Sequence, residues 1–174
     1  MSQRLSGIVL FPYGQSVMQV KVTRAWIDHA EEHAEARRDL RGIIKVSTWD
    51  IASRIADLAF LSVMSSRRML TEIPDLPIGG YTGAINLVTG DKVSINAAAT
   101  NEQFNFGAKA ALRPRAKFVK KSSIHVLALY DPPYVDFLGW AKTSQVKDYP
   151  IVRECHKVPA SDLSHMKILL SGVF

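Results

Sequence analysis

The sequence predicts an α+β (α/β) fold in which a central mixed β-sheet of about five strands is flanked by helices. Short segments alternate apolar and polar residues, which is the period of a β-strand. Two longer segments instead repeat their apolar residues every three or four positions, as a helix does. Apolar residues make up 47% of the 174 residues and charged residues 22%, which is typical of a globular protein with a core.

The length of the chain predicts a single domain over residues 1–174, large enough to form a core without a metal or a disulfide. Within it we expect an N-terminal hairpin and helix over residues 1–42, a core over residues 47–146 and a C-terminal extension over residues 147–174. No apolar run approaches the roughly 20 residues of a membrane span, so no membrane partner is expected. Cys155 is the only cysteine, which excludes an intrachain disulfide and favours a cytoplasmic location.

The first 42 residues predict a two-stranded hairpin followed by a helix. Residues 7–22 contain two apolar-rich runs separated by the turn signal Pro12-Tyr13-Gly14. The period changes at Thr23, which can cap a helix that Gly42 ends. One side of this helix is apolar at four-residue spacing and the other side is charged, so we expect one buried face.

A second helix and a tight hairpin are expected next. Ser47 or Thr48 begins the helix, whose apolar side is wide enough to lie on a sheet. Residues 71–83 contain two prolines and three glycines, which predicts a loop. The chain then forms a strand over residues 84–88, turns, and returns as a strand over residues 92–98.

The last third of the chain predicts three more strands and a final helical turn. Cations alternate with other residues over residues 113–118, so a strand here would place three cations on one face. Residues 123–130 and 134–141 are apolar strands separated by a turn. Residues 159–162 are expected to cap a helical turn around residues 163–169.

This order of elements resembles the PD-(D/E)XK nuclease superfamily, most of all its small bacterial and phage-encoded members. The shared elements are a helix, a Pro/Gly-rich loop, a tight hairpin, an apolar strand and a last strand ending in Leu138-Gly139-Trp140-Ala141. The resemblance covers roughly residues 48–146 and implies a restriction-endonuclease-like core. Residues 83–87 resemble the first catalytic strand of that family, and residues 92–96 resemble the second.

The family's chemistry needs two carboxylates and a lysine at the hairpin. The carboxylates hold a divalent cation that activates water, and the lysine stabilises developing charge. Carried onto this sequence, the three positions fall on Asn86, Ser94 and Asn96. Neutral amides and a hydroxyl are poor replacements, because Mg²⁺ rarely binds where no carboxylate is present. The resemblance therefore implies a catalytically inactive nuclease fold that acts by binding, without a metal or another cofactor.

Two other function classes stay open at this point. A metal-dependent DNA endonuclease could use a migrated site, with Mg²⁺ or Mn²⁺ as its cofactor. The acids that could build such a site are Asp57, Glu72, Asp75 and Asp91. A structural or assembly subunit is the third class. The resemblance to phage-encoded members implies an accessory or counter-defence role.

A basic cluster after the hairpin is the best binding candidate. Its members are Arg113, Arg115, Lys117, Lys120 and Lys121. The net charge of +6 favours a polyanionic partner, and a nuclease-like fold would present this region to duplex nucleic acid. The alternative interpretation is a solvated strand edge protected by charge. A protein partner in the groove emptied of catalytic residues, or a homodimer, is the other partner class.

One short motif suggests zinc. His29, Glu32 and His33 match the H-x-x-E-H pattern of inverted zinc peptidases, and Glu102 lies downstream as a third ligand. A five-residue pattern with two free positions arises easily by chance. We therefore interpret the two histidines as lying on a charged helix face.

Overall fold

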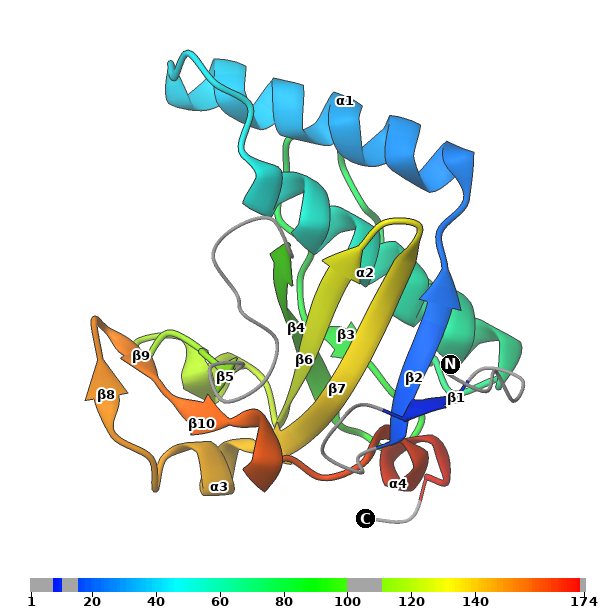
Figure 1. The fold of residues 1–174 in the computed structure, drawn as a ribbon, viewed down its shortest axis with the longest axis vertical. Helices are drawn as coiled ribbons and strands as arrows, with labels where there is room; N and C mark the ends of the chain where they lie inside the picture. Colours follow the sequence, from blue (N-terminus) through cyan, green and yellow to red (C-terminus); the bar gives the residue numbers. More distant parts are fainter. Residues whose placement is uncertain (1–7, 11–15, 100–110, 173–174) are drawn as a thin grey trace.

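The fold, seen in a computed structural model that describes residues 8–10, 16–99 and 111–172, confirms the predicted α+β class (Figure 1). Its centre is a six-stranded mixed sheet with the order β1-β2-β7-β6-β4-β3. The strands are β1 (Ile8–Leu10), β2 (Ser16–Lys21), β3 (Ile85–Asn86), β4 (Lys92–Ala99), β6 (Ile124–Asp131) and β7 (Tyr134–Lys142). Neighbouring strands are antiparallel except β4 and β6, which are parallel.

The parallel pair decides which parts of the chain meet at one end of the sheet. Because β4 and β6 run in the same direction, both begin at the same end, with Val93 beside Ile124. The strand β7 runs back along β6 and ends there, with Lys142 beside Ile124. We call this the lower end of the sheet, after its position in Figure 1.

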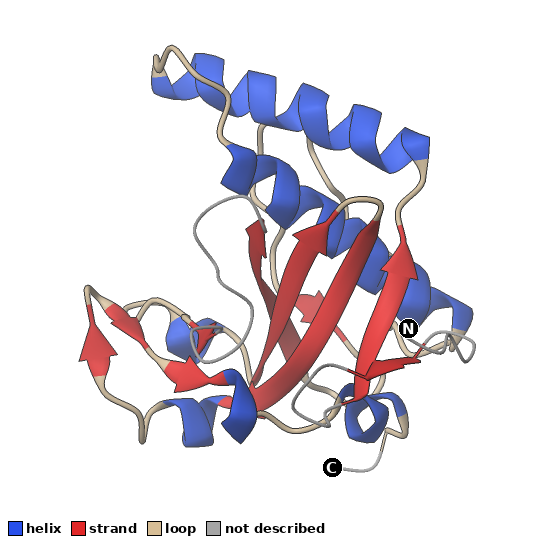
Figure 2. Cartoon of the chain, in the orientation of Figure 1, coloured by secondary structure: helices blue, strands red, loops and turns tan. Residues whose placement is uncertain are grey.

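Both predicted long helices are confirmed. The helix α1 (Arg24–Arg41) is capped by the Thr23 hydroxyl and ends at Gly42, whose φ of 62° is left-handed. The helix α2 (Thr48–Ser66) is capped by the Ser47 hydroxyl. Figure 2 shows α2 across one face of the sheet, with α1 on its outer side. None of the helices within the described residues is long and apolar enough to cross a membrane.

Two apolar clusters lie on opposite faces of the sheet. The larger cluster joins α2 to the sheet, with the rings of Phe60 and Phe137 buried at a centroid distance of 5.8 Å. The smaller cluster contains Leu112, Leu127 and Val158. Its cover includes β5 (Ala111–Leu112) and β10 (Val158–Pro159), which pair antiparallel. The sheet is therefore buried on the α2 face and, towards its lower end, partly on the other face.

Both predicted hairpins are present in the described residues. The strands β1 and β2 pair antiparallel, and their turn lies outside the described residues. The strands β3 and β4 pair with Asn86 beside Lys92, and the turn between them falls at residues 89–91 as predicted. The loop over residues 71–83 contains no helix or strand.

The strand predicted over residues 113–118 is wrong. Regular pairing stops at Leu112, and Arg115 makes a single isolated bridge with Cys155. The chain then turns, because the Phe118 N–H donates to the Arg115 carbonyl at 2.9 Å, and continues into the short 3₁₀ helix η1 (Val119–Lys121). Pro114, which lacks an N–H, cannot contribute a donor to a continuous ladder. The three cations therefore do not share a strand face.

The final helical turn also begins later than predicted. A short 3₁₀ helix, η2 (Ala160–Asp162), is followed by an extended Leu163, and α4 spans Met166–Leu170. The extended segment is bound to β7, because Trp140 and Ser164 exchange two backbone hydrogen bonds of 3.0 and 2.8 Å. A Cβ on the neighbouring Gly139 would lie 2.7 Å from the Leu163 Cβ. This close approach to β7 outweighs the local helical pattern.

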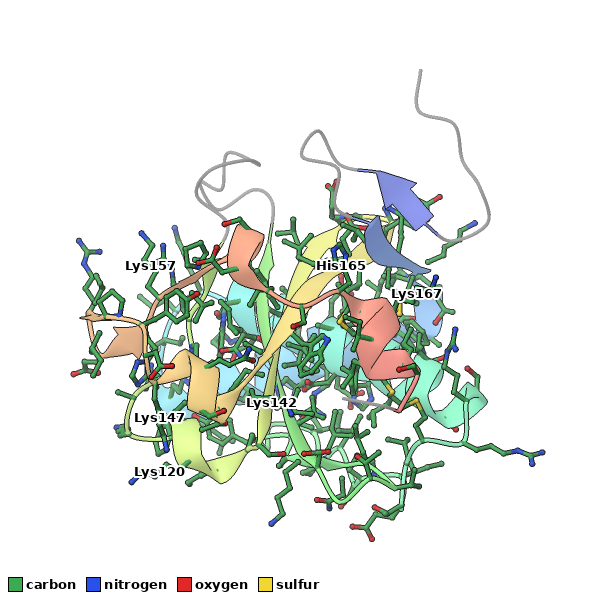
Figure 3. The ribbon with its side chains drawn as sticks, turned by 90° about the horizontal axis from the view of Figure 1, so that it is seen from below. Lys120, Lys142, Lys147, Lys157, His165 and Lys167 are labelled. Atoms are coloured by element: carbon green, nitrogen blue, oxygen red, sulfur yellow. The ribbon has the colours of Figure 1, made fainter. Side chains whose placement is uncertain are left out.

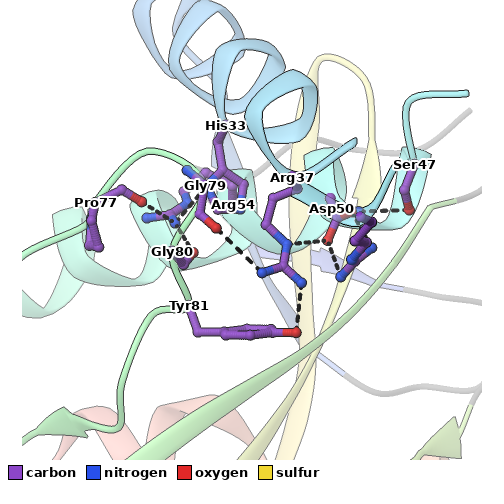
Figure 4. A network of polar contacts seen from close by, with 10 residues as sticks. His33, Arg37, Ser47, Asp50, Arg54, Pro77, Gly79, Gly80 and Tyr81 are labelled. Atoms are coloured by element: carbon purple, nitrogen blue, oxygen red, sulfur yellow. Dashed lines mark hydrogen bonds and ion pairs between the residues drawn. The ribbon is translucent and has the colours of Figure 1, made fainter. Parts of the chain in front are cut away.

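A buried arginine fixes the loop that leads to β3 (Figure 4). Arg54 of α2 is 1% exposed and donates to the carbonyls of Pro77 and Gly80 at 3.2 and 2.9 Å. It also donates to Nδ1 of His33 on α1 at 2.9 Å. The single guanidinium thus links both helices to the loop.

A second buried arginine holds the same loop, and we call Arg54, His33, Arg37 and Asp50 together the clamp. Arg37 of α1 donates to the Gly79 carbonyl at 3.4 Å and to the Tyr81 hydroxyl at 2.6 Å. Asp50 of α2 supplies the opposite charge, at 3.5 Å from Arg37 and 2.9 Å from Arg41. The clamp places the start of β3 relative to the two helices.

Candidate nucleic-acid interface

The three positions aligned with the nuclease motif lie on one face of the sheet. Val93 of β4 is buried in the cluster under α2. Successive side chains of a strand alternate between its two faces, so Ser94 and Asn96 lie on the face opposite α2. Asn86 is paired directly with Lys92 across the hairpin and shares this face. The face therefore carries two amides, a hydroxyl and one lysine.

Ser94 is engaged by a buried histidine that the sequence reasoning did not single out. The Ser94 hydroxyl lies 2.7 Å from Nδ1 of His125, whose Nε2 lies 3.2 Å from the Val119 carbonyl. The carbonyl can only accept, so the ring carries its proton on Nε2 and Nδ1 accepts from Ser94. His125 is 2% exposed, and this burial lowers its pKa to about 4. These hydrogen bonds connect β4 to β6 through the neutral His125 ring. In the sequence, the one sign of this contact is a histidine within an apolar strand.

Three of the four acids that could build a displaced metal site accept hydrogen bonds from other side chains. The four acids are Asp57, Glu72, Asp75 and Asp91. Glu72 accepts the Asn86 amide at 3.5 Å, and Asp91 accepts the Ser123 hydroxyl at 2.9 Å. Asp75 lies exposed in the loop before β3. In the part of the chain that the structure describes, no three His, Cys, Asp or Glu side chains are close enough to hold one metal ion.

Asp57 is the acid of this set that lies on α2. Its carboxylate accepts the Thr82 hydroxyl at 2.5 Å, on the side of α2 that faces the loop before β3. Burial raises the pKa of Asp57 to about 6, although the Thr82 bond and the nearby Arg54 charge oppose the shift.

The histidine motif on α1 has a structural role, and its interpretation as part of a charged face is wrong for His33. The His33 ring is buried, and its Nδ1 accepts from the Gly79 N–H at 3.1 Å as well as from Arg54. Burial lowers the pKa of His33 to about 4, which keeps the ring neutral. With Nδ1 occupied by two donors, His33 belongs to the clamp, and Glu102, the third ligand of the zinc motif, lies outside the described residues.

Four lysines line an open hollow of about 380 Å³ at the lower end of the sheet. The lysine hollow is lined by Gly90, Lys92, Lys120, Lys121, Ser122, Ser123, Thr143 and Lys147. Figure 3 looks at the molecule from this end and labels Lys120, Lys142 and Lys147 there. The four lining lysines are all exposed. They come from three segments that are far apart in the sequence.

The sheet topology explains why these segments meet. Lys92 begins β4, Lys120 and Lys121 precede β6, and Lys147 follows the short helix α3 (Thr143–Val146) at the end of β7. Hydrogen bonds fix the walls: the Ser123 hydroxyl accepts from the Lys92 N–H at 2.9 Å. The hollow is therefore a consequence of the parallel pairing of β4 with β6.

The positive charge of the hollow is not neutralised within the described part of the protein. None of its four lysines forms an ion pair with another described residue. Asp91 precedes Lys92 but is not among the lining residues, and its two carboxylate oxygens accept the hydroxyls of Ser123 and Thr89, each at 2.9 Å. Four like charges around one hollow repel each other in the absence of an anion, so the site favours a polyanionic ligand.

The five cations predicted as a binding cluster divide into two groups. Lys120 and Lys121 line the hollow. Arg113, Arg115 and Lys117 are exposed in the segment that leads to it. The sequence reasoning missed Lys92 and Lys147, because nothing local shows that they approach Lys120.

The chain matches no protein family, no curated protein and no solved structure. The functional argument therefore depends on the geometry and charge of the lysine hollow.

Proposed function

We propose that this protein binds nucleic acid through phosphate contacts at the lysine hollow and does not cleave it. The observation that carries the proposal is the convergence of four exposed lysines, from three distant segments, without a carboxylate partner among the described residues. Lysine ammonium groups bind phosphates as point charges and do not select a base sequence. A net charge of +6 adds long-range attraction for the same ligand.

The absence of cleavage is part of the same proposal. Lys92 lies two residues before Ser94 on the same face of β4, so the hollow adjoins the positions aligned with the nuclease motif. Ser94 and Asn96 follow Lys92 on this face, and neither can hold a divalent cation as a carboxylate would. We also propose that the protein is an inactive relative of the PD-(D/E)XK nucleases. An accessory or counter-defence role in a phage and a cytoplasmic location are part of the same proposal.

Charge reversal at the hollow is expected to weaken binding strongly. If each lysine contacts one phosphate, the logarithm of the binding constant falls with a slope of about −3.6 against the logarithm of salt concentration. The double variant Lys120→Glu/Lys147→Glu loses two contacts, so we expect a slope of about −1.8 and roughly 60-fold weaker binding at about 0.1 M salt. Fluorescence anisotropy with a duplex of about 20 base pairs measures both quantities.

A matched control separates the site from the overall charge. Lys21 and Lys45 are exposed, and Lys21 lies at the opposite end of the sheet, beside Tyr134. Lys21→Glu/Lys45→Glu makes the same change in net charge and is expected to weaken binding by less than about 3-fold at the same salt concentration. Equal losses in the two double variants, or no binding by the wild type at low salt, would contradict the proposal.

Cleavage is tested separately with supercoiled plasmid and Mg²⁺ or Mn²⁺. We expect no nicking by the wild-type protein. Metal-dependent nicking that Asp57→Ala or Glu72→Ala abolishes would instead establish the endonuclease with a migrated site.

A protein partner is the second candidate function, and one observation favours it. Leu40, Ile43, Ile44 and Tyr81 are exposed around the C-terminal end of α1, with Ile44 95% exposed. Apolar patches of this kind mark interaction surfaces. Sedimentation velocity across a range of protein concentrations tests self-association. A single monomeric species throughout would remove the homodimer from consideration.

A further inference from the structure

Ser123 joins the three segments that surround the lysine hollow. Its N–H donates to the Lys92 carbonyl at 2.8 Å, and its hydroxyl accepts from the Lys92 N–H at 2.9 Å. Its carbonyl accepts from the Thr143 N–H at 2.9 Å, at the start of the segment that leads to Lys147. The main chain around the hollow is therefore held in place before a ligand arrives, which lowers the conformational cost of binding.

Ser122 adds a neutral hydrogen-bond donor to the hollow. The residue lines the hollow although it is only 7% exposed. Its carbonyl accepts the Thr143 hydroxyl, whereas its own hydroxyl forms no hydrogen bond with another described residue. Buried side-chain hydroxyls are in general hydrogen-bonded. A ligand oxygen held among the lysines would supply the partner of the Ser122 hydroxyl.

The charge around the hollow exceeds the charge of one internal link of a nucleic-acid backbone. Four lysines bring four positive charges to a space of about 380 Å³. An internal phosphodiester carries a single negative charge, so it would offset only part of their mutual repulsion. A terminal phosphate carries about −1.5 to −2 at neutral pH, because its second pKa is about 6. The end of a phosphorylated strand therefore brings more negative charge to one point than an internal link does.

The size of the hollow also suits the end of a strand. Sites for small ligands have volumes of roughly 300–1,000 Å³, and the hollow lies near the lower limit of this range. The hairpin of β8 (Ile151–Val152) and β9 (Cys155–His156), which follows Lys147, contributes no lining residue. A terminal phosphate has one bond to its chain, whereas an internal phosphate has two. An end can therefore enter a small hollow while the rest of the nucleic acid stays outside.

We propose that the lysine hollow binds the terminal phosphate of a nucleic-acid strand. The inference rests on the proposed function and narrows its ligand to phosphorylated ends. The ammonium groups neutralise the terminal phosphate and the phosphodiester links next to it, and the Ser122 hydroxyl donates to a phosphoryl oxygen. A 5′-phosphate and a 3′-phosphate share this chemistry and are distinguished by experiment.

The test uses a DNA hairpin with a stem of about 20 base pairs and a fluorescent label in its loop. The open end of the hairpin carries no phosphate, a 5′-phosphate or a 3′-phosphate. By fluorescence anisotropy, we expect the wild type to bind one of the phosphorylated forms about 10-fold more tightly than the unphosphorylated form. A DNA dumbbell closed at both ends is expected to bind as the unphosphorylated hairpin does.

Charge-reversal variants locate this preference. The measured quantity is the ratio of the affinities for the phosphorylated and the unphosphorylated hairpin, so a loss of stability that affects both DNAs cancels. Lys120→Glu/Lys147→Glu is expected to lower the ratio to below about 2-fold. Lys21→Glu/Lys45→Glu makes the same change in net charge away from the hollow and is expected to retain the wild-type ratio.

A pair of serine variants tests the hydroxyl donor. Ser122→Ala is expected to lower the ratio about 3-fold, because it removes one donor to the phosphate. Ser53→Ala is the matched control, since the Ser53 hydroxyl also lacks a partner among the described residues but lies on α2, and it should leave the ratio unchanged.

Three outcomes separate the inference from the proposed function. Equal binding of all three hairpins by the wild type would overturn the inference, as would ratios in the hollow variants no lower than in their controls. If Lys120→Glu/Lys147→Glu still weakens binding of the dumbbell in those cases, the proposed function stands without the inference. A wild-type protein that binds none of these DNAs would overturn both.

Discussion

Replacing Arg54 by alanine is expected to lower the free energy of unfolding by about 3–5 kcal/mol. The substitution removes the donors to the Pro77 and Gly80 carbonyls and leaves a cavity between α2 and the loop before β3. The part-buried Gly80 carbonyl loses a charged donor, at a cost of about 1–3 kcal/mol, whereas the Pro77 carbonyl keeps the Gly80 N–H at 3.1 Å. Loss of a large buried side chain adds the cost of the cavity. Urea denaturation followed by circular dichroism measures the change.

Two further substitutions make the Arg54 prediction specific. Nε and Nη1 of Arg54 are buried without a hydrogen-bond partner among the described residues, so the native guanidinium carries a desolvation cost. Arg54→Met keeps most of the volume and removes this cost, so we expect a smaller loss of about 1–3 kcal/mol. Arg24 forms an exposed pair with Asp28, and Arg24→Ala is expected to cost at most about 0.5 kcal/mol. A loss below about 1 kcal/mol for Arg54→Ala would show that the clamp is not needed for stability.

The elements of this fold that were predicted correctly are those with local signals. The hydroxyls of Thr23 and Ser47 cap the two long helices, and the left-handed Gly42 ends the first. Each of these signals acts within four residues of the helix end that it fixes. The segment around Arg115 was predicted wrongly because the bridge that the described residues show for it is to Cys155, forty residues later in the sequence. Alternation of cations cannot reveal such a distant partner.

The candidate site was harder to predict for the same reason. Lys120 and Lys121 are adjacent and form a visible basic run, whereas Lys92 and Lys147 reach them only through the parallel pairing of β4 with β6. The buried polar groups are also non-local, because Arg54 and His33 come from different helices and meet at a loop. Charge content therefore indicated a polyanionic ligand, while the position of the hollow required the tertiary structure.

Acidification from about pH 6.5 to about pH 4 is expected to destabilise the protein through two histidines. Burial lowers the pKa of His33 and of His125 from 6.5 to about 4. Between these values the unfolded chain binds the protons that the folded protein excludes, so the free energy of unfolding falls as the pH falls. Each histidine contributes about 1.4 kcal/mol per pH unit, or roughly 3 kcal/mol over the whole interval. Above about pH 6.5 both histidines are neutral in the folded and the unfolded protein, so they cause no loss of stability there.

Asp57 acts in the opposite sense. Its pKa is raised from 3.8 to about 6, so the folded protein takes up this proton before the unfolded chain does. Its contribution to the free energy of unfolding is fully present below pH 3.8, the pKa in the unfolded chain, and is lost as the pH rises through about 6, the pKa in the folded protein. Burial also raises the pKa of Asp136, which has the same sign. The wild-type protein should therefore lose less stability on acidification than His33 and His125 alone would cause.

Urea unfolding at several pH values between about 7.5 and 4.5 separates these contributions. His33→Asn keeps an acceptor for the Gly79 N–H but cannot titrate, so we expect its pH slope to be smaller than the wild-type slope by about 1.4 kcal/mol per pH unit. Asp57→Asn removes the opposing proton, and its slope should be larger by about the same amount below pH 6. His165→Asn, at an exposed histidine, is the control for the loss of an imidazole. Parallel pH profiles for His33→Asn and the wild type would mean that His33 is not held neutral by the fold, and the clamp would then have to tolerate an imidazolium beside Arg54.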